Sequence, residues 1–288
     1  MKNASGSLLL LLTALIWGTA FVAQRFGMNF VGPLTFQAAR TLLGCVALLP
    51  VVLWRKKRLG AAFRMPSLKA SLCCGLLLTG ASTLQQIGLT TVPAGKAGFI
   101  TALYVVLVPV LGFFLGRRTN RRTWIGVALS VAGLYLLSSI SSLSVSVGEL
   151  LIMVCAVLYA LQILAIDRFA PDCDGVALSL MQFLVAGLVP LPIALAVEHP
   201  QWQQLWDARL AVFYTGVFSC GIAYTLQILG QRRTPPALAS LIMSLESVFS
   251  LIFGVLLLHE TMTGRELLGC ALMLSAVVLS QLSEMRKR

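Results

Sequence analysis

Long apolar runs follow one another along nearly the whole 288-residue chain, with short polar interruptions between them. A helix needs about 20 predominantly apolar residues to cross a bilayer. Runs of this kind occupy ten windows, at 7–26, 33–54, 69–91, 95–116, 123–142, 148–167, 175–197, 209–230, 236–258 and 265–284. The chain is 58% hydrophobic and 11% charged, whereas a soluble domain has about 25% charged residues. We therefore expect an all-α integral membrane protein with ten transmembrane helices.

The second half of the chain repeats the first at an offset of 142 residues. Thr83-Leu84-Gln85 matches Thr225-Leu226-Gln227, and Gly88 matches Gly230. Each copy holds five of the predicted helices, and because five is odd, the second copy would enter the membrane in the opposite orientation. The sequence thus predicts two inverted five-helix repeats within one membrane unit, at residues 1–142 and 143–288.

Basic residues are distributed unevenly over the predicted loops. If the N-terminus is cytoplasmic, most of the 22 lysines and arginines fall in cytoplasmic segments, which is the bias of membrane proteins. Segments 55–69 and 117–122 are basic, whereas their equivalents in the second copy, 198–208 and 259–266, have lost the positive bias. We therefore expect a multi-pass protein of the cytoplasmic (inner) cell membrane with both termini in the cytoplasm. The net charge of +12 then reflects topology, and no nucleic-acid partner is expected.

Three motifs follow one another in the chain. They are Trp17-Gly18-Thr19-Ala20-Phe21, residues 36–43 with Arg40, and Leu245-Glu246-Ser247-Val248-Phe249 followed by residues 254–260. In this order, and with the repeat, the whole chain resembles the EamA type of the drug/metabolite transporter superfamily. It departs from the family pattern at three positions, where Arg117, Ser247 and His259 replace the usual glutamate, proline and glycine, respectively. The resemblance implies two inverted repeats, a central cavity opened alternately to each side, and usually export of metabolites or drugs.

Polar and aromatic side chains inside the apolar runs are candidate substrate contacts, because polar groups in hydrocarbon are costly. The 142-residue offset pairs several of them, for example Gln85 with Gln227 and Tyr104 with Glu246, so a cavity between the repeats would receive both members of a pair. For each residue the alternative is an interhelical hydrogen bond or simple packing. The candidate substrate-binding residues are Trp17, Gln85, Gln86, Tyr104, Tyr159, Gln162, Tyr224, Gln227 and Glu246.

Two charged residues lie within the apolar windows themselves. Glu246 is near the centre of the ninth window, where an unpaired carboxylate is expensive. We expect it to couple transport to the uptake and release of protons, or to bind a cationic group; a hydrogen bond to a neighbouring helix is the alternative. Arg40 lies roughly 10 Å from the outer end of its helix, at about 1.5 Å per residue. We expect a structural role for it, through snorkelling or through pairing with a carboxylate or carbonyls.

The sequence favours a secondary active transporter of a small organic solute, such as an amino acid, another metabolite or a drug, with protons as the candidate coupling ion. No enzymatic activity, cofactor or metal is expected, since His259-Glu260 lacks the second histidine of a zinc site. Two alternatives stay open. One is an intramembrane enzyme of the prenyltransferase kind, with Mg²⁺ held by Asp167, Asp172 and Asp174, and the other is a membrane scaffold that transports nothing. Substrate identity, transport direction and oligomeric state stay open as well.

Overall fold

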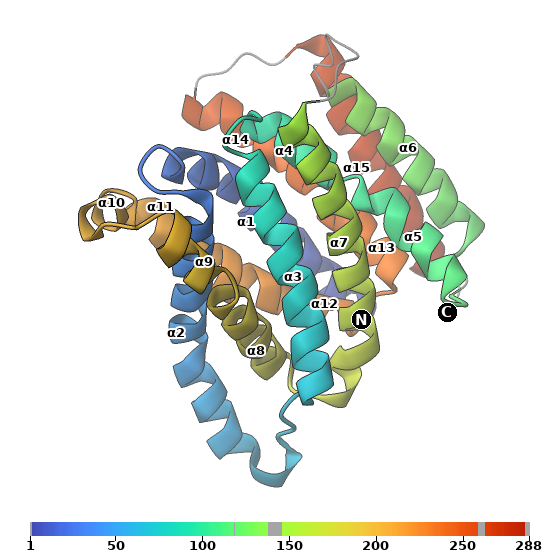
Figure 1. Cartoon of the computed structure of the whole chain (residues 1–288). Helices are drawn as coiled ribbons and strands as arrows, with labels where there is room; N and C mark the ends of the chain where they lie inside the picture. The colour runs from blue at the N-terminus through green and yellow to red at the C-terminus, as the bar shows by residue number, and fades with distance from the viewer. Residues whose placement is uncertain (1, 118, 138–145, 259–262, 286–288) are drawn as a thin grey trace.

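The computed structural model describes residues 2–117, 119–137, 146–258 and 263–285, and every regular element in these ranges is a helix (Figure 1). The first half holds α1 (Lys2–Gly27), α2 (Pro33–Leu59), η1 (Gly60–Ala62), α3 (Leu68–Gly88), α4 (Ala94–Thr101), α5 (Tyr104–Phe114) and α6 (Arg121–Leu137). The second half holds α7 (Val147–Phe169), η2 (Ala170–Asp172), α8 (Gly175–Leu188), α9 (Pro190–Val197), α10 (Trp202–Asp207), α11 (Arg209–Phe213), η3 (Tyr214–Tyr224), α12 (Thr225–Gln231), α13 (Pro236–Met243), α14 (Glu246–Leu258) and α15 (Gly264–Met285). The repeat boundary predicted at 142/143 lies outside the described residues, as do His259 and Glu260.

Seven helical spans among the described residues are long and apolar enough to cross a membrane, whereas the sequence windows predicted ten. These spans are Ser5–Gly27, Pro33–Ala62, Ala94–Phe114, Val147–Asp172, Gly175–Val197, Arg209–Gln231 and Pro236–Phe253. The three remaining windows fall on α3, α6 and α15. Helix α3 carries many serine, threonine and glutamine side chains, α6 has 17 described residues, and the apolar part of α15 is the shorter stretch Leu267–Ser280. The chain is an all-helical, multi-pass membrane protein.

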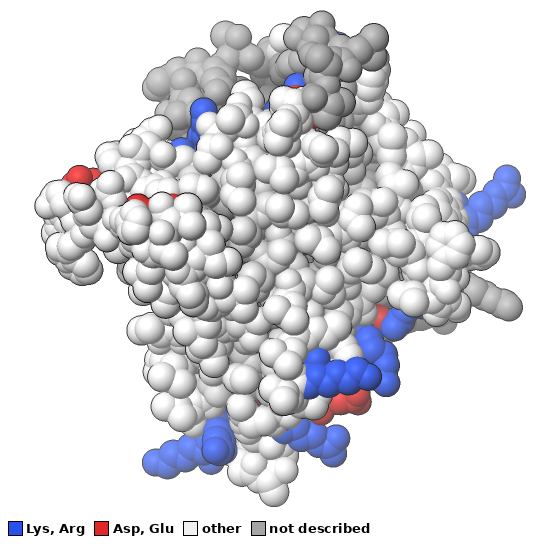
Figure 2. All heavy atoms as spheres, in the orientation of Figure 1, with Lys and Arg blue, Asp and Glu red and all other residues white. Residues whose placement is uncertain are grey.

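The outer surface has the character of a lipid-facing bundle. In Figure 2 the lysine and arginine side chains gather mostly along the lower and right-hand edges, and a broad band without charged side chains covers the helices between. Many large apolar side chains are exposed, among them Val46, Phe113 and Leu195. A soluble monomer rarely exposes a continuous apolar surface of this size, and hydrocarbon is the solvent that tolerates it.

Helices at equivalent positions of the two halves pack against each other in antiparallel pairs. The C-terminal part of α2 meets the start of α8, where Arg55 forms an ion pair with Asp174 at 2.6 Å. At the other end, the Glu198 carboxylate after α9 accepts hydrogen bonds from the backbone of Leu34 and Thr35 at 2.9 and 2.8 Å. Helices α6 and α15 pair in the same way. The carboxylate at the α2 N-terminus also complements the helix dipole.

Two equivalent close approaches between backbones hold the bundle together. A Cβ atom on Gly230 would lie 3.0 Å from the carbonyl oxygen of Gly6, and one on Gly148 would lie 3.3 Å from that of Gly88. The 142-residue offset converts the first pair into the second. Small residues let transmembrane helices approach closely enough for dense van der Waals contact. The contact of α1 with α12 therefore has the same construction as the contact of α7 with α3.

The fourth and ninth windows are not uniform helices. Each is divided by a tight turn, at residues 102–103 between α4 and α5 and at residues 244–245 between α13 and α14. Backbone bonds from i to i+3 form there, such as Val105 N to Ala102 O at 3.0 Å and Leu245 N to Ile242 O at 3.2 Å. In the second copy serine hydroxyls donate to carbonyls three residues earlier, which is a known cause of local bending. The two turns are equivalent under the repeat.

The glycine of the Trp17-Gly18 motif sets the spacing between α1 and α14. A Cβ atom at Gly18 would lie 2.5 Å from Cβ of Phe249 and 2.9 Å from the carbonyl oxygen of Glu246. We expect Gly18→Ala to lower the stability of the protein in detergent by about 1–3 kcal/mol, because α14 must move to admit the methyl group. Gly95→Ala is the matched control, since nothing lies within 4 Å of its added Cβ. Equal melting temperatures for both variants would contradict the close approach.

Candidate functional site

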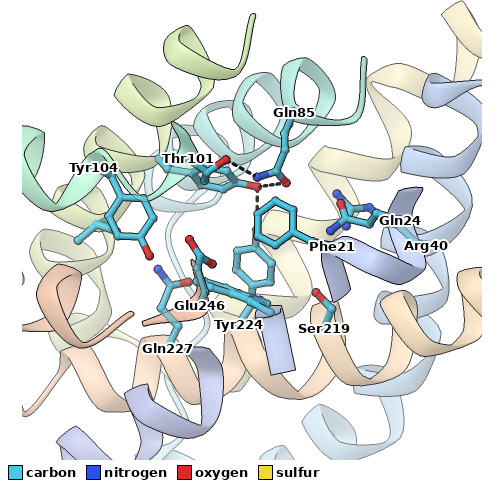
Figure 3. Close-up of a pocket in the computed structure, with 13 residues that line it drawn as sticks. Phe21, Gln24, Arg40, Gln85, Thr101, Tyr104, Ser219, Tyr224, Gln227 and Glu246 are labelled. Carbon is cyan, nitrogen blue, oxygen red and sulfur yellow. Dashed lines mark hydrogen bonds between the residues drawn. The ribbon is translucent and has the colours of Figure 1, made fainter. Parts of the chain in front are cut away.

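A narrow cavity lies between the two halves of the bundle, at the centre of the helices (Figure 3). The space that the centre of a water molecule can occupy in it is about 30 Å³, which is room for roughly two waters. Residues of both halves line it, namely Trp17, Phe21, Gln24, Arg40, Gln85, Thr101, Tyr104, Tyr159, Ile163, Ser219, Tyr224, Gln227 and Glu246. In this conformation an organic solute would need the walls to move apart before it could enter.

A chain of side-chain hydrogen bonds crosses from the second half to the first along the cavity wall. The Tyr224 hydroxyl donates to the Tyr159 hydroxyl at 3.1 Å, and Tyr159 donates to Oε1 of Gln85 at 3.4 Å. Gln85 then donates through Nε2 to the Thr101 hydroxyl at 3.1 Å, as the dashed lines in Figure 3 show. The Trp17 ring packs on Tyr224 with ring centroids 4.6 Å apart. This wall is therefore polar, aromatic and fixed in position by its own bonds.

The two tight turns deliver Tyr104 and Glu246 to the cavity. Each is the first residue of the helix that follows its turn, α5 for Tyr104 and α14 for Glu246. The two side chains interact, and both are buried, with 2% and 3% of their surface exposed. No lysine or arginine among the described residues forms an ion pair with Glu246. A discontinuous helix that ends at a central site is a recurring feature of transporters.

Several polar atoms of the cavity wall are buried without a hydrogen-bond partner in the described part of the chain. They are Nε1 of Trp17, Oε1 of Gln24 and Oε1 of Gln227. A buried polar atom without a partner costs about 1–3 kcal/mol, so a concentration of such atoms in one place needs an explanation. Donors and acceptors both occur among them, which suits a polar solute.

Arg40 is also buried, with 3% of its surface exposed, and reaches the cavity from α2. Its Nε and Nη2 atoms both donate to Oε1 of Gln37, at 2.8 and 2.6 Å. Gln37 in turn donates to the Ser82 hydroxyl at 2.6 Å. The sequence-based expectation of pairing with a carboxylate or backbone carbonyls is not met among the described residues, where the partner is a neutral amide. Deep burial likewise leaves no room for snorkelling.

The structure gathers most of the residues predicted to contact substrate around this cavity. Trp17, Gln85, Tyr104, Tyr159, Tyr224, Gln227 and Glu246 line it. Gln86 and Gln162 do not: Gln86 donates to Sδ of Met28 at 3.1 Å, and Gln162 bonds to Gln182 and Gln227 behind the wall. The bonds of Gln162 are interhelical, the alternative that the sequence left open, and the bond of Gln86 joins α3 to the turn that follows α1.

Lining residues absent from the prediction are Phe21, Gln24, Thr101, Ile163 and Ser219. The helical spacing of Phe21 and Gln24 from Trp17, four and seven residues, was the signal available for two of them. Ser219 gave no such signal, because it lies in η3, where the helix widens into π-helical turns that a sequence pattern does not show. Such widened turns are frequent at functional sites.

The acidic residues considered for Mg²⁺ have other partners. Asp174 caps α8 by accepting from the backbone of Val176 and Ala177 at 3.0 and 3.1 Å, and it pairs with Arg55. Asp167 pairs with Arg117, and Asp172 with Arg168 at 3.5 Å. Within the described ranges, no group of three or more His, Cys, Asp or Glu side chains is arranged to hold a metal ion. Helix capping and ion pairing account for this cluster.

The tyrosine pair in the wall makes a prediction for stability. We expect Tyr159→Phe to cost about 1–3 kcal/mol, because it leaves Tyr224 without an acceptor and Gln85 without a donor. Tyr224→Phe should cost less, since only one bond is lost. In a double-mutant cycle measured by unfolding in detergent, the two changes should couple by at least about 0.5 kcal/mol. Additive effects would show that the two hydroxyls do not interact.

Comparison with known proteins assigns this chain to a family. The model of the EamA-like transporter family matches residues 4–139 and again residues 146–282. An uncharacterized transporter of Archaeoglobus fulgidus is 28% identical over 98% of this chain and 87% of its own. The threonine/homoserine exporter RhtA of Escherichia coli (strain K12) is 27% identical over 96% of this chain and 90% of its own.

A solved crystal structure shares the fold. It superimposes with a TM-score of 0.83 and 21% identity, and the match covers 99% of both chains. The two family matches together span nearly the whole sequence, and the family consists of transporters rather than enzymes. The chain therefore belongs to the EamA-like transporter family, with two EamA domains.

Proposed function

We propose that this protein is a secondary active transporter that exports a small polar organic solute by alternating access around the central cavity. The observation that carries the proposal is a cavity between the two halves that is lined by polar and aromatic side chains of both, several with buried polar atoms that have no partner in the described part of the chain. A scaffold has no use for such atoms, because each lowers its stability. A solute with its own donors and acceptors would satisfy them during passage.

The proposed architecture is two inverted five-helix repeats, at residues 1–142 and 143–288. Support comes from the antiparallel pairing of equivalent helices, α2 with α8 and α6 with α15, since equivalent helices of opposite direction are what an inverted repeat requires. The repeated glycine contacts and the two equivalent tight turns add to it. A cavity on the interface between such repeats can be exposed to either side by rocking one repeat against the other.

The proposed location is the cytoplasmic (inner) membrane, with both termini in the cytoplasm. The ion pairs at the helix ends agree with the predicted topology. Arg55 and Asp174, both predicted to be cytoplasmic, pair at one end of the bundle, and Lys96 and Glu149, both predicted to lie outside, pair at the other end. The inner membrane transporter YedA of Escherichia coli (strain K12), 27% identical over 94% of this chain and 88% of its own, is a relative in such a membrane.

The proposed substrate class is small amino acids or similar metabolites. The exporter RhtA, which is named for threonine and homoserine, matches over nearly the whole chain. Amide, hydroxyl and indole groups of the cavity suit a solute with hydroxyl and amino groups. Export driven by a proton gradient needs a group that changes its charge at the site, and Glu246 is the carboxyl in the cavity wall.

Solute counterflow tests the transport function. In proteoliposomes loaded with an unlabelled amino acid, we expect the purified protein to accumulate the same labelled amino acid, with L-threonine as the first probe and the other proteinogenic amino acids as the panel. Gln85→Leu and Gln227→Leu should each reduce the rate at least tenfold, because they remove polar groups from the wall. Absence of flux for every solute, or flux indifferent to both substitutions, would favour the scaffold or a different site.

Glu246→Gln separates coupling from transport. Glutamine has nearly the same shape as glutamate but cannot titrate, so accumulation driven by a pH gradient in inverted vesicles should fall to the passive rate. Counterflow needs no net proton movement, so it should persist at saturating solute concentration, although a neutral amide binds an ammonium group more weakly than a carboxylate does. Asp207→Asn, the same change at an exposed residue near the end of α10, is the matched control. Gradient-driven accumulation that survives in Glu246→Gln would remove this residue from the coupling mechanism.

A further inference from the structure

We propose that Arg40 is a carboxylate-binding subsite of the central cavity, so that the transported solute is a small zwitterion held between Arg40 and Glu246. The proposal rests on the transport function proposed above and deepens it. It also reverses the structural role that the sequence favoured for this residue. Three observations carry it: the burial of the guanidinium, the way its neighbours fix it, and the position of Glu246 on the same cavity.

The charge of Arg40 has no counter-ion in the described part of the chain. The described ion pairs involve Arg55, Lys96, Arg117 and Arg168, and Arg40 is not among them. An arginine keeps its proton in proteins, so burial cannot neutralise it. A buried and unpaired charge costs several kcal/mol unless a partner arrives. The cavity that Arg40 lines is the place from which such a partner would come.

The local structure orients the guanidinium and leaves part of it available. Two of its nitrogens, Nε and Nη2, donate to the same oxygen of Gln37, and Nη1 makes no hydrogen bond with a described residue. Gln37 is held by Ser82, whose hydroxyl donates to the Leu78 carbonyl at 2.6 Å. A guanidinium fixed in this way loses little further freedom when it binds a carboxylate. A residue that served only to join helices would use its remaining donors on them.

The second pole of the cavity is Glu246. In Figure 3 the Glu246 carboxyl lies on one side of the Phe21 ring and Arg40 lies on the other side. Both side chains are 3% exposed, and they form no ion pair with each other. The cavity thus contains one positive and one negative group that do not neutralise each other directly.

A zwitterion matches this arrangement better than a singly charged solute does. Its carboxylate can meet Arg40 while its ammonium group meets Glu246, and the net charge of the closed cavity does not change. A simple amine would pair with Glu246 and leave Arg40 unpaired, and a monocarboxylate would do the reverse. Each mismatch leaves a buried charge without a partner, which is the strongest form of discrimination available to such a site.

The test compares amino acids with their decarboxylated amines on the purified full-length protein. Binding is measured by thermal stabilisation and titration, with the twenty proteinogenic amino acids as probes and, for each that binds, the matching amine (1-amino-2-propanol for L-threonine). We expect at least one amino acid to bind the wild-type protein, and its amine to bind roughly 30-fold or more weakly. Arg40→Gln should weaken amino acid binding by a similar factor without weakening amine binding, and Arg40→Lys should fall between.

Arg25→Gln is the matched control, because Arg25 lies at the end of α1 and donates to the carbonyls of Leu89 and Thr90 rather than lining the cavity. It should leave the preference for the amino acid unchanged. If Arg40→Gln does not yield folded protein, the wild-type comparison and Arg40→Lys still decide. Equal binding of amine and amino acid, undiminished amino acid binding by Arg40→Gln, or no binding of any amino acid overturns the subsite. Counterflow of a solute without a carboxyl group would overturn it while transport stands, whereas absence of all flux would remove the transport function itself.

Discussion

Close backbone contact between helices is the constraint on which this structure depends. In lipid, apolar side chains gain nothing by turning away from the solvent, so helices are held by dense packing and interhelical hydrogen bonds. Gly6 with Gly230 and Gly88 with Gly148 provide that packing twice, in equivalent places. Gly18 provides it a third time, where α1 meets the first turn of α14. These contacts fix the two central helices, α1 and α7, on which the equivalent residues Trp17 and Tyr159 face the cavity.

The polar interior follows from the same constraint. With no water in the hydrocarbon core, each buried amide or hydroxyl must find its partner within the bundle. Most do, through short chains such as Tyr224 to Tyr159 to Gln85 and Arg40 to Gln37 to Ser82. In the part of the chain that the structure describes, several atoms left without partners lie on the wall of the cavity. Others, such as Oγ1 of Thr83 and Oγ of Ser179, lie elsewhere in the described bundle, so the polar and aromatic lining from both halves marks the site, rather than the missing bonds alone.

The all-helical membrane fold and the repeat could be predicted from the sequence, because each depends on a periodic or repeated pattern. Of the nine residues predicted to contact substrate, seven line the cavity. Glu246 and Tyr104 could be found as an offset pair, but the tight turn before each could not, since no sequence signal marks it in both copies. Gln86 and Gln162 look the same as Gln85 in sequence, and only packing decides which amide faces a neighbouring helix. The sequence favours a structural role for Arg40, because it does not show that the folded bundle places no carboxylate beside this residue among the described residues.

The proposed roles of Arg40 and Glu246 together determine which states of the carrier can cross between orientations. With a zwitterion bound, both charges are paired, and the closed cavity contains no uncompensated carboxylate. When the solute leaves, Glu246 in its charged form would be buried without a partner, at a cost of several kcal/mol. Arg40 keeps its charge throughout, and Gln37 continues to solvate it. A proton on Glu246 removes the penalty of the buried carboxylate and leaves that of Arg40 unchanged, so of the two empty forms the protonated one would return more readily. Under the proposed roles, proton and solute compete for one carboxyl group, and this competition would allow an inward flow of protons to expel the solute.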